Sequence, residues 1–368
     1  MGNKNSMTKS LLNKALGIFL DPLLAIIFSF TLGAIIIAAL GYDVGLAFKA
    51  LFLGSFGNIR AISHTLLAAT PLMFTAMSFS MAYRCGLFNL GAEGQFYIGA
   101  IMGAWMGFAV KGVPPVLHVI IVILAGALGG MAVAFIPAIL KAKRGVNEVI
   151  IGIMMNYIAI NVTNYLVSTN GPLRFGSTLP ATPMVQGTAK LAVLIPGTGL
   201  TGGFLIAIFF AVAFYLFIWK TRGGYKIRAV GDNPFAAECG GIKKVKYSIV
   251  AMLIAGALAG IGGAIEIIGI HSRFYAGFSP GYGFEGIAVG MLGSNHPFGI
   301  LLSALLFGAL KTGAMAMQIQ AGTNSELVKI LQALVIFFIA GKWSVMTLTS
   351  RARSKRQNNK TDSTPIIK

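Results

Sequence analysis

Polar side chains inside or beside long apolar runs are the residues of this sequence best suited to chemistry. Asn89, Glu93 and Gln95 stand at the start of one such run. A carboxylate in apolar surroundings is costly unless it is paired or protonated, so such residues often bind a polar substrate or an ion. The alternative is structural, with Asn89 as a helix cap and Glu93 near the positive end of the helix dipole. Both interpretations stay open for Glu93, whereas we expect Gln95 to face a pathway.

A second set of polar residues follows a helical spacing. Tyr157, Asn161 and Asn164 are four and three residues apart, which places them on one face of a helix. An aromatic ring and two amides would suit a base and a ribose, through stacking and paired hydrogen bonds. The alternative is hydrogen bonding between helices, which Asn commonly provides inside membrane bundles. We favour the pathway interpretation for this stripe.

Phe284 and Glu285 begin a short apolar segment, residues 284–292. Broken helices at membrane depth often border a cavity, so we predict that both side chains line a pathway. The alternative is that Glu285 is solvated at the outer interface. Glu266 lies within another apolar run and needs a partner that the sequence does not identify.

Motifs of soluble enzymes are missing from the sequence. There is no G-x-x-x-x-G-K-[ST] phosphate loop, so the chain is not expected to hydrolyse ATP by that route. The four histidines lack the spacing of a zinc helix, and neither cysteine has that of a metal site. We therefore predict no catalytic residue, no metal site and no enzyme activity.

The apolar runs that must position these residues define the fold class. Hydrophobic residues make up 56% of the 368 residues and charged residues only 11%, against about 25% in soluble domains. Runs near the length of a transmembrane helix recur along the chain. We therefore predict an all-α, polytopic bundle of about ten spans, one of them short or broken, with an interfacial amphipathic stretch at 46–56. The predicted spans are 22–41, 62–83, 88–110, 116–140, 149–167, 200–219, 247–270, 284–292, 298–317 and 327–340.

The distribution of charge predicts the orientation. There are 29 Lys and Arg residues against 10 Asp and Glu, and the basic residues fall in the short segments between apolar runs. This pattern is typical of cytoplasmic loops facing anionic lipid and argues against a nucleic-acid partner. With ten spans and both termini inside, 21 of the 29 basic residues are cytoplasmic. The predicted parts are a cytoplasmic N-terminal segment (1–21), a transmembrane domain (22–341) and a basic cytoplasmic tail (342–368).

The segment 220–246 predicts a short helix on the cytoplasmic face. Asp232 or Asn233 can cap a helix, Pro234 suits its first position, and 235–239 make about one turn. Gly240 and Gly241 can end it through a left-handed residue. This turn is either an ordinary solvated connector or a rigid plug presented to a cytosolic partner.

Three ordered motifs carry a family resemblance. Arg228-Ala-Val-Gly-Asp-Asn-Pro-Phe-Ala-Ala-Glu resembles the cytoplasmic coupling loop of ABC importer permeases of the sugar and nucleoside uptake family. Phe88-Asn-Leu-Gly-Ala-Glu-Gly-Gln-Phe-Tyr-Ile-Gly-Ala and Gly283-Phe-Glu-Gly-Ile-Ala-Val-Gly-Met-Leu-Gly resemble two further segments of that family. The likeness extends from about residue 66 to 340 and is closer to the nucleoside-type branch. The resemblance assigns contact with the ATPase to Asp232, Asn233, Pro234, Phe235, Ala236, Ala237 and Glu238.

The resemblance also implies a function and partners. The chain would be a multi-pass plasma-membrane permease for nucleosides that works by alternating access. Its partners would be a cytosolic ATPase that holds ATP and Mg, a second permease copy or a paralogue, an extracytoplasmic substrate-binding lipoprotein, and lipid. The chain itself would carry no cofactor. A ribose-type sugar permease and an ion-coupled secondary transporter, using Glu93, Glu266 or Glu285, remain alternatives; the turn at Pro234 favours the ATP-driven class.

Overall fold

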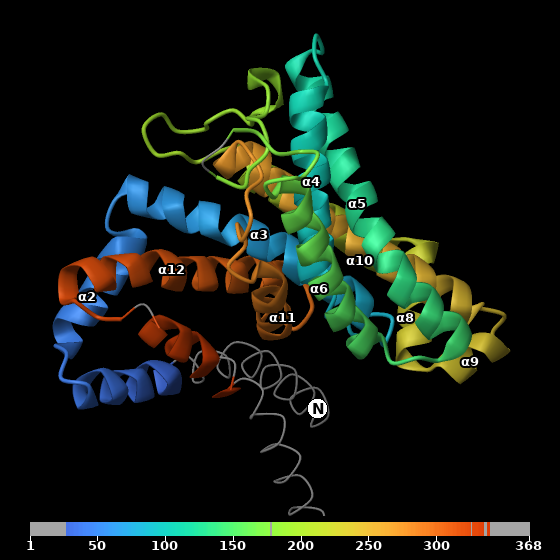
Figure 1. Cartoon of the computed structure of the whole chain (residues 1–368). Coiled ribbons are helices and arrows are strands. Elements are labelled where there is room, and N and C mark those ends of the chain that lie inside the picture. Colours follow the sequence, from blue (N-terminus) through green and yellow to red (C-terminus); the bar gives the residue numbers. More distant parts are fainter. Residues whose placement is uncertain (1–26, 177–178, 325, 335–336, 339–368) are drawn as a thin grey trace, which may run out of the picture. The chain divides into compact units, whose positions relative to one another are not determined.

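The computed structural model describes residues 27–176, 179–324, 326–334 and 337–338, shown in Figure 1. In this part of the chain every named element is helical, and only two isolated β-bridges occur. The all-α prediction is confirmed. The described residues divide into two compact units, one within Phe52–Gly313 and the other formed by the described residues on either side of it.

The helices follow the apolar runs closely, because each run is long enough to satisfy its own backbone hydrogen bonds. A helix at Ile27–Ala39 comes first, and residues 326–334 and 337–338 are helical at the end of the described chain. The elements between them are α2 (Val44–Phe56), α3 (Ile59–Tyr83), α4 (Ala92–Ala109), α5 (Pro115–Arg144), α6 (Glu148–Val167), η1 (Gly187–Ala189), α7 (Gly203–Lys220), α8 (Arg222–Asp232), α9 (Pro234–Cys239), α10 (Lys244–Glu266), η2 (Ile267–His271), α11 (Tyr282–Leu292) and α12 (Pro297–Ala321).

Six helices of the described chain are long and apolar enough to cross a membrane. They are α3, α5, α6, α7, α10 continued through η2, and α12, and each coincides with a predicted span. The predicted span at 88–110 becomes α4, whose first turn carries polar residues and which is not among the six. The predicted span at 284–292 becomes α11, which at 11 residues is about 16 Å long and too short to cross alone. The count of ten spans remains a prediction.

Two predicted regions lie outside the described residues. They are the N-terminal segment 1–21 and the basic tail 342–368, and the predicted spans 22–41 and 327–340 are described only in part. The stretch predicted at 46–56 is the helix α2, in which Lys49 is the only charged residue. Exposed apolar residues occur all along this helix, from Leu46 to Phe56, so its amphipathic character is weak.

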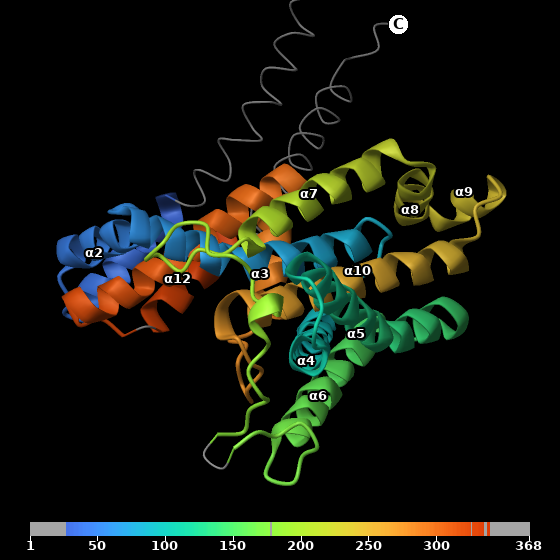
Figure 2. The same ribbon diagram turned by 90° about the horizontal axis from the view of Figure 1, so that it is seen from above.

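Glycine residues set the packing of α4, α5 and α10, which lie side by side in Figures 1 and 2. A Cβ atom added at Gly99 of α4 would overlap the backbone of Gly260 on α10. A Cβ atom added at Gly130 of α5 would likewise overlap the carbonyl group of Gly256. The backbones therefore touch, and dispersion across the contact holds the helices together.

One set of connections gathers at one end of the larger unit. The Arg84 guanidinium, after α3, donates to the Asn295 carbonyl, after α11, at 2.8 Å. The Phe88 backbone N–H approaches Glu148 Oε1, at the start of α6, at 3.4 Å. Gly231 of α8 lies so close to the Arg84 carbonyl that a Cβ atom there would overlap it. The connections after α3, α5, α7 and α11 therefore share one end.

The connections after α4, α6 and α10 gather at another end of the larger unit. The Gln186 N–H donates to the Gly107 carbonyl at 2.8 Å, and the Val185 N–H donates to the Ser272 carbonyl at 2.9 Å. His118 Nδ1 is 2.8 Å from Thr188 Oγ1. The segments after α4, α6 and α10 are thus joined to one another. Successive connections alternate between two ends, which is the arrangement of helices that run back and forth.

Candidate functional site

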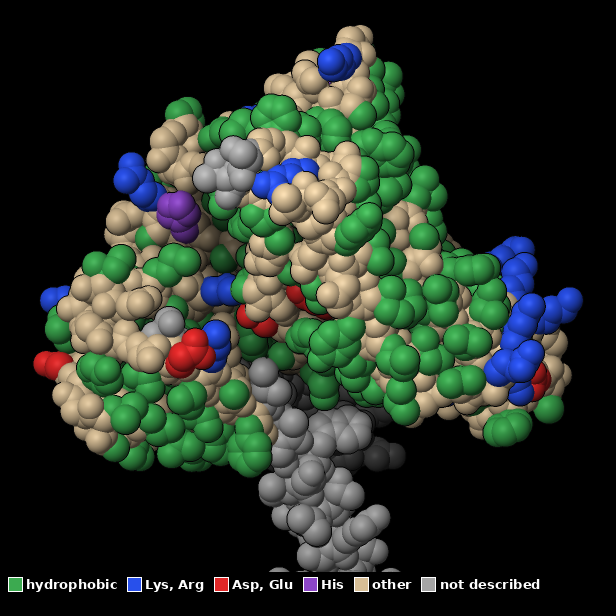
Figure 3. Space-filling view, viewed as in Figure 1, with side chains coloured by type: hydrophobic (Ala, Val, Ile, Leu, Met, Phe, Trp, Pro, Cys, Tyr) green, Lys and Arg blue, Asp and Glu red, His purple; other side chains and the backbone are tan. Residues whose placement is uncertain are grey.

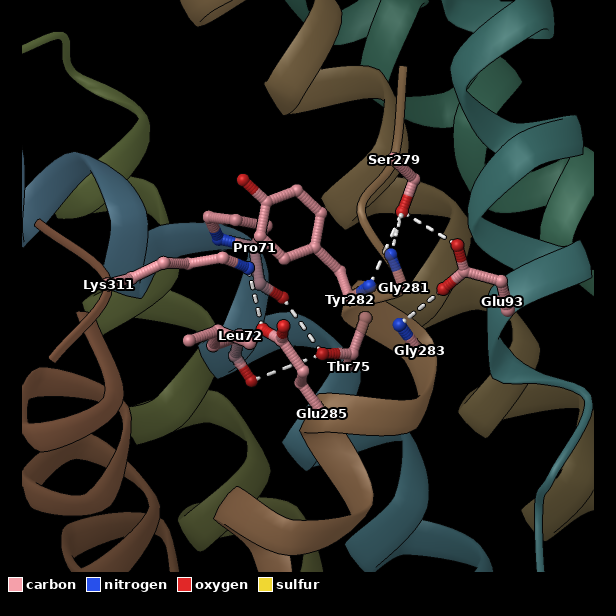
Figure 4. Close-up of polar contacts among 10 residues, drawn as sticks. All are labelled: Pro71, Leu72, Thr75, Glu93, Ser279, Gly281, Tyr282, Gly283, Glu285 and Lys311. Atoms are coloured by element: carbon pink, nitrogen blue, oxygen red, sulfur yellow. Dashed lines mark hydrogen bonds and ion pairs between the residues drawn. The ribbon is translucent and has the colours of Figure 1, made fainter. Parts of the chain in front are cut away.

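Glu93 lies at the N-terminus of the short helix α11 (Figure 4). Its side chain is 3% exposed and accepts hydrogen bonds from the Gly283 N–H at 2.5 Å and from Ser279 Oγ at 2.7 Å. Ser279 Oγ in turn accepts from the N–H groups of Gly281 and Tyr282. Glu93 therefore caps α11, a role that neither sequence interpretation of this residue included. A Cβ atom at Gly283 would overlap the Glu93 backbone, so this contact requires glycine.

An ion pair lies beside this cap. Lys311 Nζ of α12 is 2.7 Å from Glu285 Oε2 and 4.2 Å from the centroid of the Tyr282 ring. Glu285 is therefore a paired carboxylate, and its role in lining a pathway stays a prediction (Figure 4). Phe284 is exposed, as is Met291 seven residues later on the same face of α11.

Asn89 and Gln95 are hydrogen-bonded to each other. The Asn89 amide donates to Gln95 Oε1 at 2.8 Å, and the Gln95 amide donates to Asn89 Oδ1 at 3.0 Å. Asn89 also donates to Ser78 Oγ, and both amides are buried. The alternative of Asn89 as helix cap is wrong, because α4 has Gly91 at its cap position with no side-chain hydrogen bond there. A pathway role for Gln95 would require this pair to open.

Asn156 provides the polar contact that the sequence interpretation missed. Its Oδ1 accepts from the Gly94 N–H at 2.8 Å, and its Nδ2 donates to the Leu90 carbonyl at 2.7 Å. The start of α4 is thus held by a side chain from α6. The only sequence signal for this contact is the position of Asn156 directly before Tyr157 in an apolar run.

The stripe on α6 is separate from the α11 region. Tyr157 is 66% exposed, and the Asn161 amide donates back to the Tyr157 carbonyl at 2.8 Å. Asn164 Oδ1 is buried and has no hydrogen-bond partner among the described residues. No hydrogen bond of the stripe, within the described chain, reaches Glu93 or Glu285.

His271 is the partner of Glu266 that the sequence left unidentified. Its Nε2 lies 3.3 Å from Glu266 Oε1, and its Nδ1 lies 3.5 Å from the Tyr275 hydroxyl. Glu266 is 2% exposed, and its second oxygen has no partner among the described residues. Burial and the nearby Glu266 carboxylate raise the pKa of Tyr275.

The predicted cytoplasmic turn is present as α9. Asn233 Oδ1 accepts from the N–H groups of Phe235 and Ala236 at 3.1 and 3.0 Å, so Asn233 rather than Asp232 is the cap. Asp232 instead ends α8, a helix that the sequence interpretation did not include. Gly241, with φ of +76°, is the left-handed residue that follows the helix.

The surface of α9 is open. Phe235 is 76% exposed, and Glu238 forms an ion pair with Lys244 at 2.8 Å, while Ala237 is buried. Lys244 Nζ also lies 5.5 Å from the Phe235 ring centroid. Lys and Arg side chains gather over the region of α8 and α9 (Figure 3). This helix thus presents an exposed aromatic side chain next to basic side chains.

Arg84 connects α8 with α11. Its guanidinium donates to the carbonyls of Ser294 and Asn295 and lies 5.0 Å from the Trp219 ring centroid. Burial, and then the charge of Arg228, lower the pKa of Arg84. Ser294 and Asn295 have φ of 54° and 52°, a left-handed conformation that non-glycine residues adopt at a cost. The arginine therefore holds the end of α11 in a fixed conformation next to α8.

Comparisons with known proteins agree with the sequence motifs. Residues 61–340 match a family model described as branched-chain amino acid transport system / permease component. The nucleoside ABC transporter permease protein NupB of Lactococcus lactis subsp. cremoris is 37% identical over 350 residues, 93% of this chain and 96% of that protein. The guanosine ABC transporter permease protein NupP of Bacillus subtilis is 36% identical over 94% of this chain and 99% of its own length. The glucose ABC transporter permease protein TsgB13 of Haloferax volcanii is 33% identical over 86% of each chain.

Proposed function

The chain belongs to the family of branched-chain amino acid transport system permease components, and from this premise we propose that it forms the nucleoside path of an ATP-driven importer. It is a multi-pass membrane protein and the permease subunit of an ABC importer. Such permeases act with an ATPase and a substrate-binding protein. The single observation that carries the proposal is the capped, exposed helix α9 within a chain closely similar to nucleoside permeases. ATP and Mg would be bound by the ATPase.

Nucleosides are the favoured substrates because two similar relatives are named for nucleoside or guanosine transport, at 37% and 36% identity. A sugar is the second candidate, since a relative at 33% identity is named for glucose. The pathway would be lined by the α6 stripe of Tyr157, Asn161 and Asn164 and by the ion pair at the start of α11. The buried residues Glu93, Asn89 and Gln95 would hold the starts of α4 and α11 in position beside this pathway.

The proposed topology has ten crossings, both termini in the cytoplasm and the 220–246 loop on the same side. The alternation of connections between two ends of the larger unit supports it, as does the excess of basic residues on the side of α8 and α9. In this scheme α11 completes one crossing together with the non-helical segment before it. Residues 22–341 would be the transmembrane domain, with 1–21 and 342–368 exposed to the cytoplasm.

Coupling is proposed to pass through α9. Phe235 would anchor this helix in a cleft of the ATPase, because a buried aromatic residue commonly dominates a small interface. Basic residues around it would steer docking and contact lipid headgroups. Arg84 would carry the movement of α8 to α11, because it is bonded to the end of α11 and packed against Gly231 of α8.

The test is uptake into proteoliposomes containing the permease, its partner permease copy or paralogue, the ATPase and the binding lipoprotein. Radiolabelled adenosine, uridine and ribose are compared with and without ATP inside. We expect ATP-dependent uptake of nucleosides that exceeds that of ribose. Uptake of ribose alone would establish the sugar alternative, and uptake driven by an ion gradient without ATP would refute the importer class.

A further inference from the structure

The acidic side chains of the helical bundle differ in whether a ligand can reach them. Glu93 and Glu266 are almost fully buried, at 3% and 2% exposure. The side chains of Glu285 and Lys311 are 24% and 23% exposed, although they pair with each other on α11 and α12. Lys311 is about 21 Å from the start of α12 and about 15 Å from its end, so the pair lies near the middle of a candidate span. The Glu285–Lys311 pair is therefore both deep within a candidate span and accessible to a ligand.

This pair has unused hydrogen-bonding capacity. The Lys311 ammonium carries three donors, and one of them is used on Glu285 Oε2. The other Glu285 oxygen accepts no hydrogen bond from the described residues. A charged group near the middle of a membrane span costs free energy because it is removed from water. Hydrogen bonds to an incoming polar molecule would offset this cost. The pair therefore offers a strong acceptor and strong donors side by side.

The surroundings hold the pair in place. The Lys311 ammonium lies over the face of the Tyr282 ring at 4.2 Å, where the ring attracts the cation (Figure 4). Glu285 is two residues beyond Gly283, whose N–H is bonded to Glu93, so the start of α11 cannot rotate freely. Because the pair is already held in position, its side chains lose little conformational entropy when a ligand binds.

The same surroundings exclude stacking of a flat base. One side of Tyr282 is occupied by the Lys311 ammonium, and its ring also packs on Phe96 with centroids 5.7 Å apart. Tyr282 is itself buried, so its ring offers no open face to a base. The exposed Phe284 ring lies on the face of α11 that it shares with Met291, and not on that of Glu285. What the pair can bind is a group that both donates and accepts hydrogen bonds without needing a stacking surface.

We propose that Glu285 and Lys311 form a subsite for the vicinal 2′- and 3′-hydroxyl groups of the nucleoside ribose. One hydroxyl would donate to the free Glu285 oxygen while accepting from Lys311, and the neighbouring hydroxyl would take a second ammonium donor. Carboxylates bind the ribose hydroxyls of dinucleotides in a comparable way. The inference rests on the proposed function, and it assigns to this site the recognition of the sugar rather than of the base.

The experiment compares uridine with 2′,3′-dideoxyuridine in the reconstituted importer. Wild-type protein is expected to favour uridine at least tenfold in kcat/KM for uptake. In Glu285→Gln and Lys311→Met, uptake of uridine falls at least tenfold while uptake of 2′,3′-dideoxyuridine changes less than threefold. The binding lipoprotein is the same in every sample, so a change in discrimination between variants reports on the permease.

Lys329→Met is the matched control. Lys329 pairs with Glu326 at 2.9 Å, but both side chains are well exposed, so its loss leaves discrimination unchanged. Basal ATP hydrolysis and the yield of monodisperse complex show whether each variant is folded, and Glu285→Gln retains an acceptor for Lys311. Equal losses of both substrates in folded Glu285→Gln would show that the pair is only structural and overturn the inference. Absence of any nucleoside uptake by the wild type would instead refute the proposed function.

Discussion

Removing the Glu93 carboxylate should destabilise the start of α11, and the free-energy cost follows from the hydrogen bonds that are lost. The carboxylate accepts two hydrogen bonds, at 2.5 Å from the buried Gly283 N–H and at 2.7 Å from the partly buried Ser279 hydroxyl. A donor that loses its partner costs about 1–3 kcal/mol, so Glu93→Ala, which leaves two donors unpaired, should cost about 2–6 kcal/mol. Glu93→Gln keeps one carbonyl acceptor for Gly283 and should cost roughly half as much.

The assay is the fraction of purified permease that stays monodisperse after heating, measured for wild type and both variants over a temperature series. The expected order of stability is wild type, then Glu93→Gln, then Glu93→Ala, and uptake should fall in the same order because α11 carries the ion pair. Glu326→Ala is the control, since its exposed pair with Lys329 contributes less than about 1 kcal/mol. A Glu93→Ala protein as stable as Glu326→Ala would refute the role of this carboxylate as a cap.

Three further predictions address the end of the molecule that carries α8 and α9. Phe235→Ala removes the exposed anchor of α9 and should abolish substrate-stimulated ATP hydrolysis while leaving the permease inserted; wild-type stimulation would make the helix a mere connector. At pH 7.5 a maleimide should label exposed Cys239 and not Cys85, because burial raises the pKa of Cys85 to about 11 and keeps it protonated; mass spectrometry after digestion locates the label. Arg84→Lys keeps the charge but loses the planar fork, so uptake per ATP hydrolysed should drop, whereas an unchanged ratio would exclude Arg84 from the coupling route.

Several features of the fold follow directly from the order of residues. The helices coincide with apolar runs because a backbone in lipid must form its N–H to C=O hydrogen bonds within its own segment. This requirement depends on local sequence alone. The turn at Pro234 is equally local, since a cap, a proline and two glycines act within one turn. Glycines four residues apart, such as Gly256 and Gly260, indicate that helix backbones approach closely, but they do not say which helices meet.

The partners of the polar residues were decided only by tertiary structure. Glu93 caps α11, which lies about 190 residues further along the chain, and Asn156 holds the start of α4 from another helix. Spacing along one helix tells which side chains share a face, but not which other helix that face meets. A buried polar group must find a partner wherever the packing brings one near, so its role depends on contacts between distant segments. The sequence by itself therefore determined the long apolar helices, the short turn at Pro234 and the family, while the tertiary structure decided that Glu285 is bonded to Lys311 and Asn89 to Gln95.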